Sequence, residues 1–132
     1  MCIFCKIING EIPSFKIYET EDLVAFLDIS QATKGHTLIV PKKHFDNLLA
    51  LDEETLKKIS VAQKEVANIL SKKLGTNAFN FVNNCGSVAG QSVMHVHFHV
   101  IPRYENDDFK MHIVEHEPNF EELAKLHKLI TE

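Results

Sequence analysis

The chain has 132 residues, enough for one domain with an apolar core but too few for two. Its 14 Lys and Arg against 18 Asp and Glu give a formal net charge of −4, which provides no general attraction for a nucleic-acid backbone. A 45% share of hydrophobic residues and a 24% share of charged ones exclude the disordered and fibrous classes. The unusual count is histidine, with 8 residues.

The N-terminal sequence has no basic region followed by a long apolar run, and no stretch of 18 apolar residues occurs anywhere. We therefore expect neither a secretory signal nor a membrane partner. Three cysteines is an odd number for a disulfide framework, so a cytoplasmic protein with reduced thiols is expected. The pair Cys2-x-x-Cys5 then has three explanations: metal ligands, a redox pair, or small apolar residues of a helix.

In chain order, residues 3–9 are expected to form a short amphipathic helix that ends at Gly10. Residues 16–19 alternate in polarity and residues 23–27 form an apolar run, so both are predicted to be strands. A third strand is predicted over residues 36–40, ended by a proline.

The strongest helix signal begins at Asp52, an N-cap residue, and continues to Leu74, followed by Gly75 as the terminator. Its expected apolar face consists of Leu56, Ile59, Ala62, Val66, Ile69, Leu70 and Leu74. Two more strands are predicted over residues 78–82 and 93–101, and a final helix over 118–130. Because strands cluster and do not alternate regularly with helices, the sequence predicts an α+β fold with a mainly antiparallel sheet.

Three of the histidines occupy alternate positions in the last predicted strand. Side chains on a strand have a period of two, so His95, His97 and His99 are expected on one face and the intervening apolar residues on the other. The row has three explanations: an ordinary polar face, a metal site, or a phosphate-transfer site in which one imidazole is the nucleophile.

The residues around the row favour phosphate chemistry. The preceding loop, residues 83–92, is rich in amides, hydroxyls and glycines that suit phosphate oxygens. No Asp or Glu lies between Glu65 and Glu105, whereas a zinc hydrolase usually needs a carboxylate beside the metal.

The segment HVHFHVI resembles the signature of the histidine triad (HIT) family. The segments CIFCKII, AFLDI, GHTLIVPK and GQSV also resemble blocks of that family, in the same order. The resemblance implies a single HIT domain over residues 1–132, with a motif-matched core at 2–103 and a variable tail at 104–132. It implies a five-stranded sheet, one long helix, short terminal helices and a two-fold dimer, of the histidine triad nucleotide-binding (Hint-like) branch of bacterial type.

The resemblance also assigns catalytic roles. His97 is expected to attack phosphorus and form a nucleotidyl-histidine, and its other ring nitrogen is expected to bond a backbone carbonyl of its own strand. His99 and His36 are expected to donate hydrogen bonds to phosphate oxygens, and His95 to support the cluster. Ser92 is expected to relay a proton to the leaving group.

Nucleotide binding is expected to involve Asp28 at the ribose hydroxyls and an apolar slot for the base. The residues implied are Phe26, Asp28, Ile29, Asn84, Gly90, Gln91 and Ser92, together with His97 and His99.

The resemblance extends to a structural metal. Cys2, Cys5, His44 and His95 match the zinc ligands of some family members and form a Cys₂His₂ set suited to a closed tetrahedral site. The chemistry itself requires no metal. If zinc binds, His95 is a ligand and not a free donor in the active site.

The function implied is that of a nucleotide hydrolase or nucleotidyl transferase, cleaving at the α-phosphate of purine phosphoramidates or aminoacyl-AMP (AMP or GMP conjugates). The alternatives are a dinucleoside polyphosphate hydrolase and a nucleotide-binding scaffold protein with little catalysis. His112, His116 and His127 in the tail have no assigned role.

Overall fold

The computed structural model describes residues 2–132, and its centre is one five-stranded sheet in the order β1-β2-β3-β5-β4. All four strand pairings are antiparallel. The strands are β1 (Lys16–Glu19), β2 (Leu23–Leu27), β3 (Thr37–Pro41), β4 (Phe79–Val82) and β5 (Phe98–Pro102). The predicted α+β class with an antiparallel sheet is confirmed, and each of the first four strands lies within one residue of its predicted bounds.

Three α-helices accompany the sheet: α1 (Ile3–Ile8), α2 (Glu53–Leu74) and α3 (Phe120–Thr131). Helix α2 begins where the Asp52 carboxylate accepts a hydrogen bond from the Thr55 backbone N–H at 3.0 Å. It ends at Gly75, whose φ of +75° is the left-handed conformation that glycine adopts most readily. The cap and terminator predicted from the sequence are therefore both in place. No described helix is long and apolar enough to cross a membrane.

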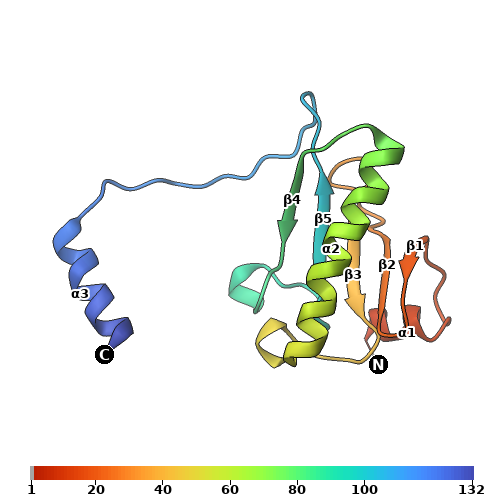
Figure 1. The fold of residues 1–132 in the computed structure, drawn as a ribbon, viewed down its shortest axis with the longest axis horizontal. Helices are drawn as coiled ribbons and strands as arrows, with labels where there is room; N and C mark the ends of the chain where they lie inside the picture. Colours follow the sequence, from red (N-terminus) through yellow and green to blue (C-terminus); the bar gives the residue numbers. More distant parts are fainter. Residues whose placement is uncertain (1) are drawn as a thin grey trace.

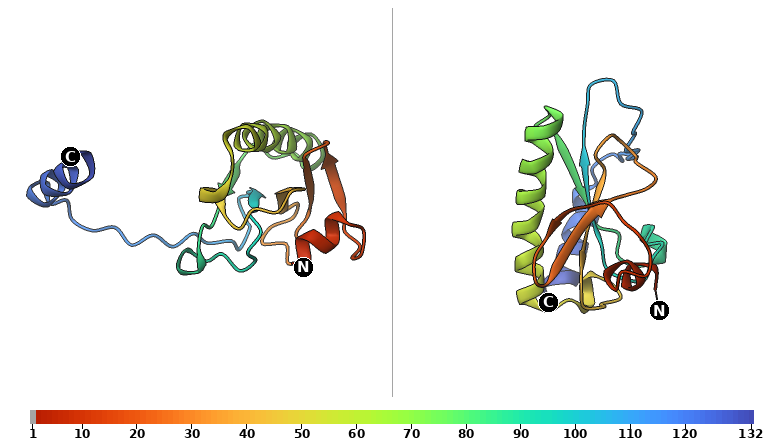
Figure 2. Two further views of the ribbon diagram at one scale, coloured as in Figure 1. Left: turned by 90° about the horizontal axis from the view of Figure 1, so that it is seen from below. Right: turned by 90° about the vertical axis from the view of Figure 1, so that its right-hand side faces the viewer.

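The sheet lies between α2 and α1, which cover its opposite faces (Figures 1 and 2). On one face, Ile59 and Val66 of α2 pack against Ile39 and Val100. On the other face, Phe4 and Ile7 of α1 pack, in a second cluster, against Val24, Phe26, Leu38 and Val40. Both layers are needed because the central strands are buried on both faces.

The predicted strand over residues 93–101 is too long, since β5 begins only at Phe98. The proposed period-two row is therefore wrong in detail: only His99 lies in the strand. The reason is visible at Pro41, whose carbonyl oxygen is 2.8 Å from the His95 Nε2. The His95 side chain occupies the carbonyl oxygen of Pro41, and Pro41 has no N–H. Neither backbone group of Pro41 is therefore available to extend the hydrogen bonds between β3 and β5.

The C-terminal arm, residues 110–132, leaves the sheet as an extended chain and ends in α3, well separated from the rest of the molecule (Figure 1). Every residue of the arm is exposed. The predicted helix is present, with Asn119 as its N-cap. None of its apolar side chains is buried within this chain, although the stripe contains Phe120, Leu123, Leu126, Leu129 and Ile130.

Candidate functional site

A cavity of about 260 Å³ opens beside the histidines, with apolar walls and a polar end. Two walls come from α1 with the loop that follows it, and from β2 with the residues after it. His97, His99 and Ser92 lie at the polar end. The lining residues are Ile3, Phe4, Ile7, Ile12, Pro13, Ser14, Phe15, Phe26, Leu27, Asp28, Ile29, Leu38, Ser92, Val93, His97 and His99.

His97 is held in one tautomer by its own backbone. Its Nδ1 is 2.8 Å from the carbonyl oxygen of His95, and because a carbonyl only accepts, Nδ1 carries the proton. The lone pair is thereby left on Nε2, the nitrogen suited to attack. The carbonyl of His97 in turn accepts a hydrogen bond from the Asn83 side-chain amide at 3.0 Å. This is the backbone acceptor that the sequence predicted for a nucleophilic imidazole.

His36 and His99 form a hydrogen-bonded chain that ends in the cavity. The Ala32 backbone N–H donates to His36 Nδ1 at 3.1 Å, so the proton of neutral His36 is on Nε2. His36 Nε2 then donates to His99 Nδ1 at 2.8 Å, which leaves the His99 proton on Nε2. His99 is thus arranged as a hydrogen-bond donor at the polar end of the cavity.

These imidazoles are kept neutral by burial. Desolvation by burial is the main cause that lowers the pKa of His99 to about 4; the electrostatic effects of His97 and His36 act in the same direction, and the Asp28 carboxylate opposes them. Burial also lowers the pKa of His36, again opposed by the Asp28 carboxylate. At neutral pH His36 and His99 are therefore neutral, and the tautomers given for these two residues apply.

Asp28, His36 and His99 bring their ligand atoms within 4.8 Å of one another. A cation there would need lone pairs on both facing imidazole nitrogens, but His36 Nε2 and His99 Nδ1 share a proton at 2.8 Å. Asp28 instead lies 3.7 Å from His36 Nε2, and its other oxygen accepts the Ser30 backbone N–H at 2.7 Å. The trio is therefore better suited to orienting a proton than to holding a metal.

The residues of the loop that precedes His95 fall into two groups, those that line the cavity and those that do not. Ser92 lines the cavity. Gln91 is buried and its amide is used inside the protein: Nε2 donates to the carbonyls of Asp46 and Val93, and Oε1 accepts from the Gly86 N–H. Asn84 and Gly90 are neighbours of each other and are outside the cavity lining. Their proposed contacts with a nucleotide stay predictions.

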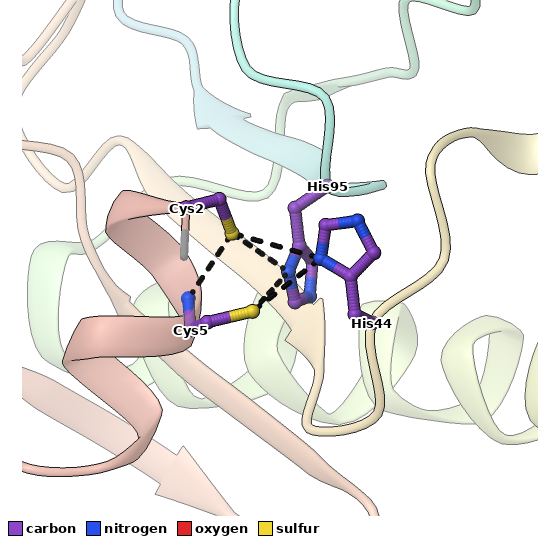
Figure 3. A group of neighbouring side chains, drawn as sticks. All are labelled: Cys2, Cys5, His44 and His95. Atoms are coloured by element: carbon purple, nitrogen blue, oxygen red, sulfur yellow. Dashed lines mark hydrogen bonds between the residues drawn. The ribbon is translucent and has the colours of Figure 1, made fainter.

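A second cluster lies behind the cavity, where Cys2 and Cys5 of the N-terminal segment meet His44 and His95 (Figure 3). The distances from the two Sγ atoms to the two Nδ1 atoms are 3.7, 3.3, 3.3 and 3.5 Å. Two zinc bonds of about 2.3 Å to sulfur and 2.05 Å to nitrogen, at the tetrahedral angle, would separate S and N by about 3.6 Å. The four residues therefore already have the spacing of a tetrahedral metal site.

Both imidazoles of the cluster are oriented by partners on their far side. His95 Nε2 donates to the Pro41 carbonyl at 2.8 Å, and His44 Nε2 donates to the Asp46 carboxylate at 2.9 Å. Each Nδ1 therefore has its lone pair directed at the sulfur atoms. Backbone-carbonyl and carboxylate partners of this kind are the usual outer contacts of metal-ligating histidines.

Sequence reasoning missed the contribution of α1 to the cavity. The helical pattern of residues 3–9 predicts Ile3, Phe4 and Ile7 only as part of an apolar helix face, and Phe15 lies in a loop with no motif. Phe15 is 71% exposed and lines the cavity together with Ile29, which the resemblance assigns to nucleotide binding and which is 93% exposed. Apolar side chains that no core covers suit a flat apolar ligand.

A family model for the HIT domain matches residues 9–106. The chain belongs to the HIT family. It is 43% identical over 128 residues to the adenosine 5'-monophosphoramidase HNT1 of Saccharomyces cerevisiae, covering 96% of this chain and 78% of that protein.

Solved structures agree with the fold and the family. A crystal structure from Streptococcus mutans matches with a TM-score of 0.93 at 45% identity, covering 98% of this chain and 82% of that one. A zinc-bound histidine triad family protein from Mycobacterium smegmatis matches with a TM-score of 0.79 at 33% identity, covering 97% and 96%.

Proposed function

We propose that this HIT protein is a nucleoside phosphoramidase-type hydrolase that cleaves at the α-phosphate of purine nucleoside monophosphate conjugates. The observation that carries the proposal is His97, whose Nδ1–H is bonded to the His95 carbonyl and whose Nε2 lone pair remains for attack at the end of an apolar cavity. The similarity to a yeast adenosine 5'-monophosphoramidase supports this substrate class.

In the proposed reaction the base occupies the apolar part of the cavity and Asp28 accepts from the ribose hydroxyls. His97 Nε2 forms a bond to phosphorus while the bond from phosphorus to the leaving amine breaks; the amine takes the proton of the Ser92 hydroxyl, which is exposed and takes a proton from solvent in return. The His95 carbonyl stabilises the positive charge that His97 acquires. Water then attacks phosphorus, the bond to Nε2 breaks, and the nucleoside monophosphate leaves. His99 Nε2–H donates to a phosphate oxygen in both steps.

The test compares His97→Ala and His97→Asn with the wild-type chain and with His127→Asn, a control on exposed α3. We expect both His97 variants to lose hydrolysis of an AMP phosphoramidate and to keep AMP binding, with the control unchanged. Hydrolysis retained in both would overturn the covalent step. Preferred turnover of a diadenosine polyphosphate would identify the alternative hydrolase, and tight AMP binding without turnover in the wild type would identify a binding protein.

We also propose a structural zinc ion at Cys2, Cys5, His44 and His95, supported by the S···N spacing and by the zinc-bound relative. Bound there, zinc would supply a cross-link between α1 and the two histidine segments, with no step of the reaction at the metal. All three cysteines are free thiols, which is consistent with the proposed cytoplasmic location. Less than about half a zinc ion per chain in protein prepared without chelator would contradict the site.

A single domain with a variable tail at 104–132, assembled as a two-fold dimer, is the proposed organisation. The outer surface of α2 and β4 supports it, because Val61 and Phe81 are 57% and 48% exposed there. Sedimentation as a single-chain species at micromolar concentration would contradict the dimer.

A further inference from the structure

The two cysteines of the cluster lie on the short helix α1, which forms a wall of the cavity: Cys2 caps its N-terminus and Cys5 lies within it. Helix α1 has six residues, too few to be stable by itself. Cys2 is its N-cap, with Sγ accepting the Cys5 backbone N–H at 3.3 Å. What else holds α1 is the packing of Phe4 and Ile7. The cluster is thus one of few anchors of this helix.

Phe4 connects the cluster with the nucleophile. It lies between the two cysteines in sequence, is 6% exposed, and lines the cavity. Its ring centroid is 5.1 Å from that of His97, 5.9 Å from that of His95 and 5.7 Å from that of Phe26, all in edge-on geometry. A displacement of α1 would therefore remove a wall of the cavity and a contact of the His97 ring together.

His95 provides a second connection. Its Nδ1 faces both sulfur atoms, its Nε2 bonds the Pro41 carbonyl, and its own carbonyl oxygen bonds His97 Nδ1. Whatever fixes the His95 ring also restrains the backbone group that sets the His97 tautomer. The cluster therefore reaches the nucleophile through a helix and through a shared residue.

We propose that metal binding at the cluster and nucleotide binding in the cavity are positively coupled, with α1 as the coupling element. Without the metal, α1 is joined to His44 by thiol-to-imidazole contacts and to His95 by such contacts and the edge of the Phe4 ring, and these contacts are weak. A larger fraction of molecules then has α1 displaced, and the apparent nucleotide affinity falls by the fraction that stays competent. This inference rests on the proposed function for its choice of AMP as ligand.

The test measures AMP affinity by calorimetry with zinc-loaded and chelator-stripped full-length protein, and zinc affinity by chelator competition with and without AMP. We expect zinc removal to weaken AMP binding by about 5- to 150-fold, the usual range of such couplings, and AMP to tighten zinc binding by the same factor. His44→Asn, which removes a ligand outside α1, should give the stripped affinity even with zinc added. His127→Asn is the control.

Hydrogen exchange of the α1 amides gives a readout without nucleotide: zinc should slow it. Equal AMP affinity with and without zinc would overturn the coupling and leave the proposed function intact. Failure of AMP to bind either form, with α1 still protected by zinc, would overturn the nucleotide assignment and the coupling to it. A chain that binds no zinc would overturn the proposed metal site and the coupling together, and would leave the proposed hydrolase function intact.

A separate observation concerns the C-terminal arm, residues 110–132. A 12-residue helix is marginal in water, yet α3 exposes Phe120, Leu129 and Ile130 at 78%, 76% and 72%. The Streptococcus mutans crystal structure matches 98% of this chain with a TM-score of 0.93, so the match extends into the arm. The arm of this chain is exposed along its whole length, and a similar fold over 98% of the chain in a crystal structure indicates that the position of the arm is not arbitrary.

We infer that the arm packs on a second copy of this chain, which extends the proposed dimer. In a two-fold dimer each arm can lie on the other chain, so one symmetric exchange buries the apolar side chains of both arms, and such a contact continues the proposed dimer interface. We expect α3 amides to be protected from exchange at dimer concentrations and to lose protection on dilution. Leu123→Glu should remove that protection, and Lys125→Gln, on a polar position of α3, should keep it. Unprotected α3 amides in a chain that sediments as a dimer would overturn the inference.

Discussion

The neutral state of His99 predicts how stability depends on pH. Its pKa falls from an ordinary 6.5 to about 4 in the folded chain because the ring is desolvated beside His97 and His36. Between these two values the unfolded chain binds a proton that folded His99 does not. The unfolded state therefore binds more protons, and the free energy of unfolding must rise with pH through this window.

The magnitude follows from the size of the window. One proton gives a slope of at most ~1.4 kcal/mol per pH unit. The His99 ring is only partly buried, so solvent screening reduces the effect, and we expect about 1–2 kcal/mol between pH 4.5 and 6.5. Burial of His36 lowers its pKa as well and adds a contribution of the same sign.

The assay is urea unfolding at several pH values between 4.5 and 7.5 and constant ionic strength, for the wild-type chain, His99→Gln and the exposed control His127→Gln. The difference between wild type and His99→Gln isolates His99, because both chains keep the Cys2, Cys5, His44 and His95 cluster and lose any metal alike. We expect the His99→Gln profile to be flatter and the control to follow the wild type. Parallel profiles for wild type and His99→Gln would refute the assignment of a neutral, desolvated His99.

Two further substitutions test the fold around the site. Gly35→Ala should destabilise the chain by about 1–3 kcal/mol more than Gly10→Ala. Both glycines have positive φ (+96° and +79°), but only at Gly35 would a Cβ lie 2.5 Å from the Leu74 Cδ1. Equal losses of stability in urea unfolding would contradict this. Arg103 and the Tyr104 backbone N–H hold the pKa of Asp107 well below its usual range. The stabilisation from this ion pair is complete above the unfolded pKa of 3.8 and is lost as pH falls below it. Asp107→Asn should therefore make the free energy of unfolding depend less on pH in acid. An unchanged acid transition would show that the ion pair does not cause the loss of stability there.

The sequence alone determined the elements whose signals are local. Asp52 and Gly75 bracket α2 because a cap and a left-handed glycine act within one helical turn. The HIT signature likewise identified the family, and the resemblance brought together Cys2, Cys5, His44 and His95, which the structure places in one cluster. Periodicity was less reliable along α2, where Ile59 and Val66 are buried but Leu56 and Ile69 are more than a third exposed.

Only the tertiary structure decided what each histidine contacts. The period of a strand predicts His95, His97 and His99 on one face, but β5 begins only at Phe98. The three rings have different surroundings: His95 contacts Cys2 and Cys5, His97 lines the cavity, and His99 contacts His36. The tautomers depend on acceptors such as the Pro41 carbonyl, 54 residues from His95. A local pattern holds no information about a partner so distant in the chain.

Helix α1 and the C-terminal arm also show which features the sequence predicts and which only the structure decides. An amphipathic pattern shows that a helix has an apolar face but not what that face contacts. For α1 the face meets the sheet and the cavity, and for α3 it meets nothing within its own chain. The residue types and their order along the chain therefore specify the chemistry available, and packing between distant segments specifies which atoms are free to perform it.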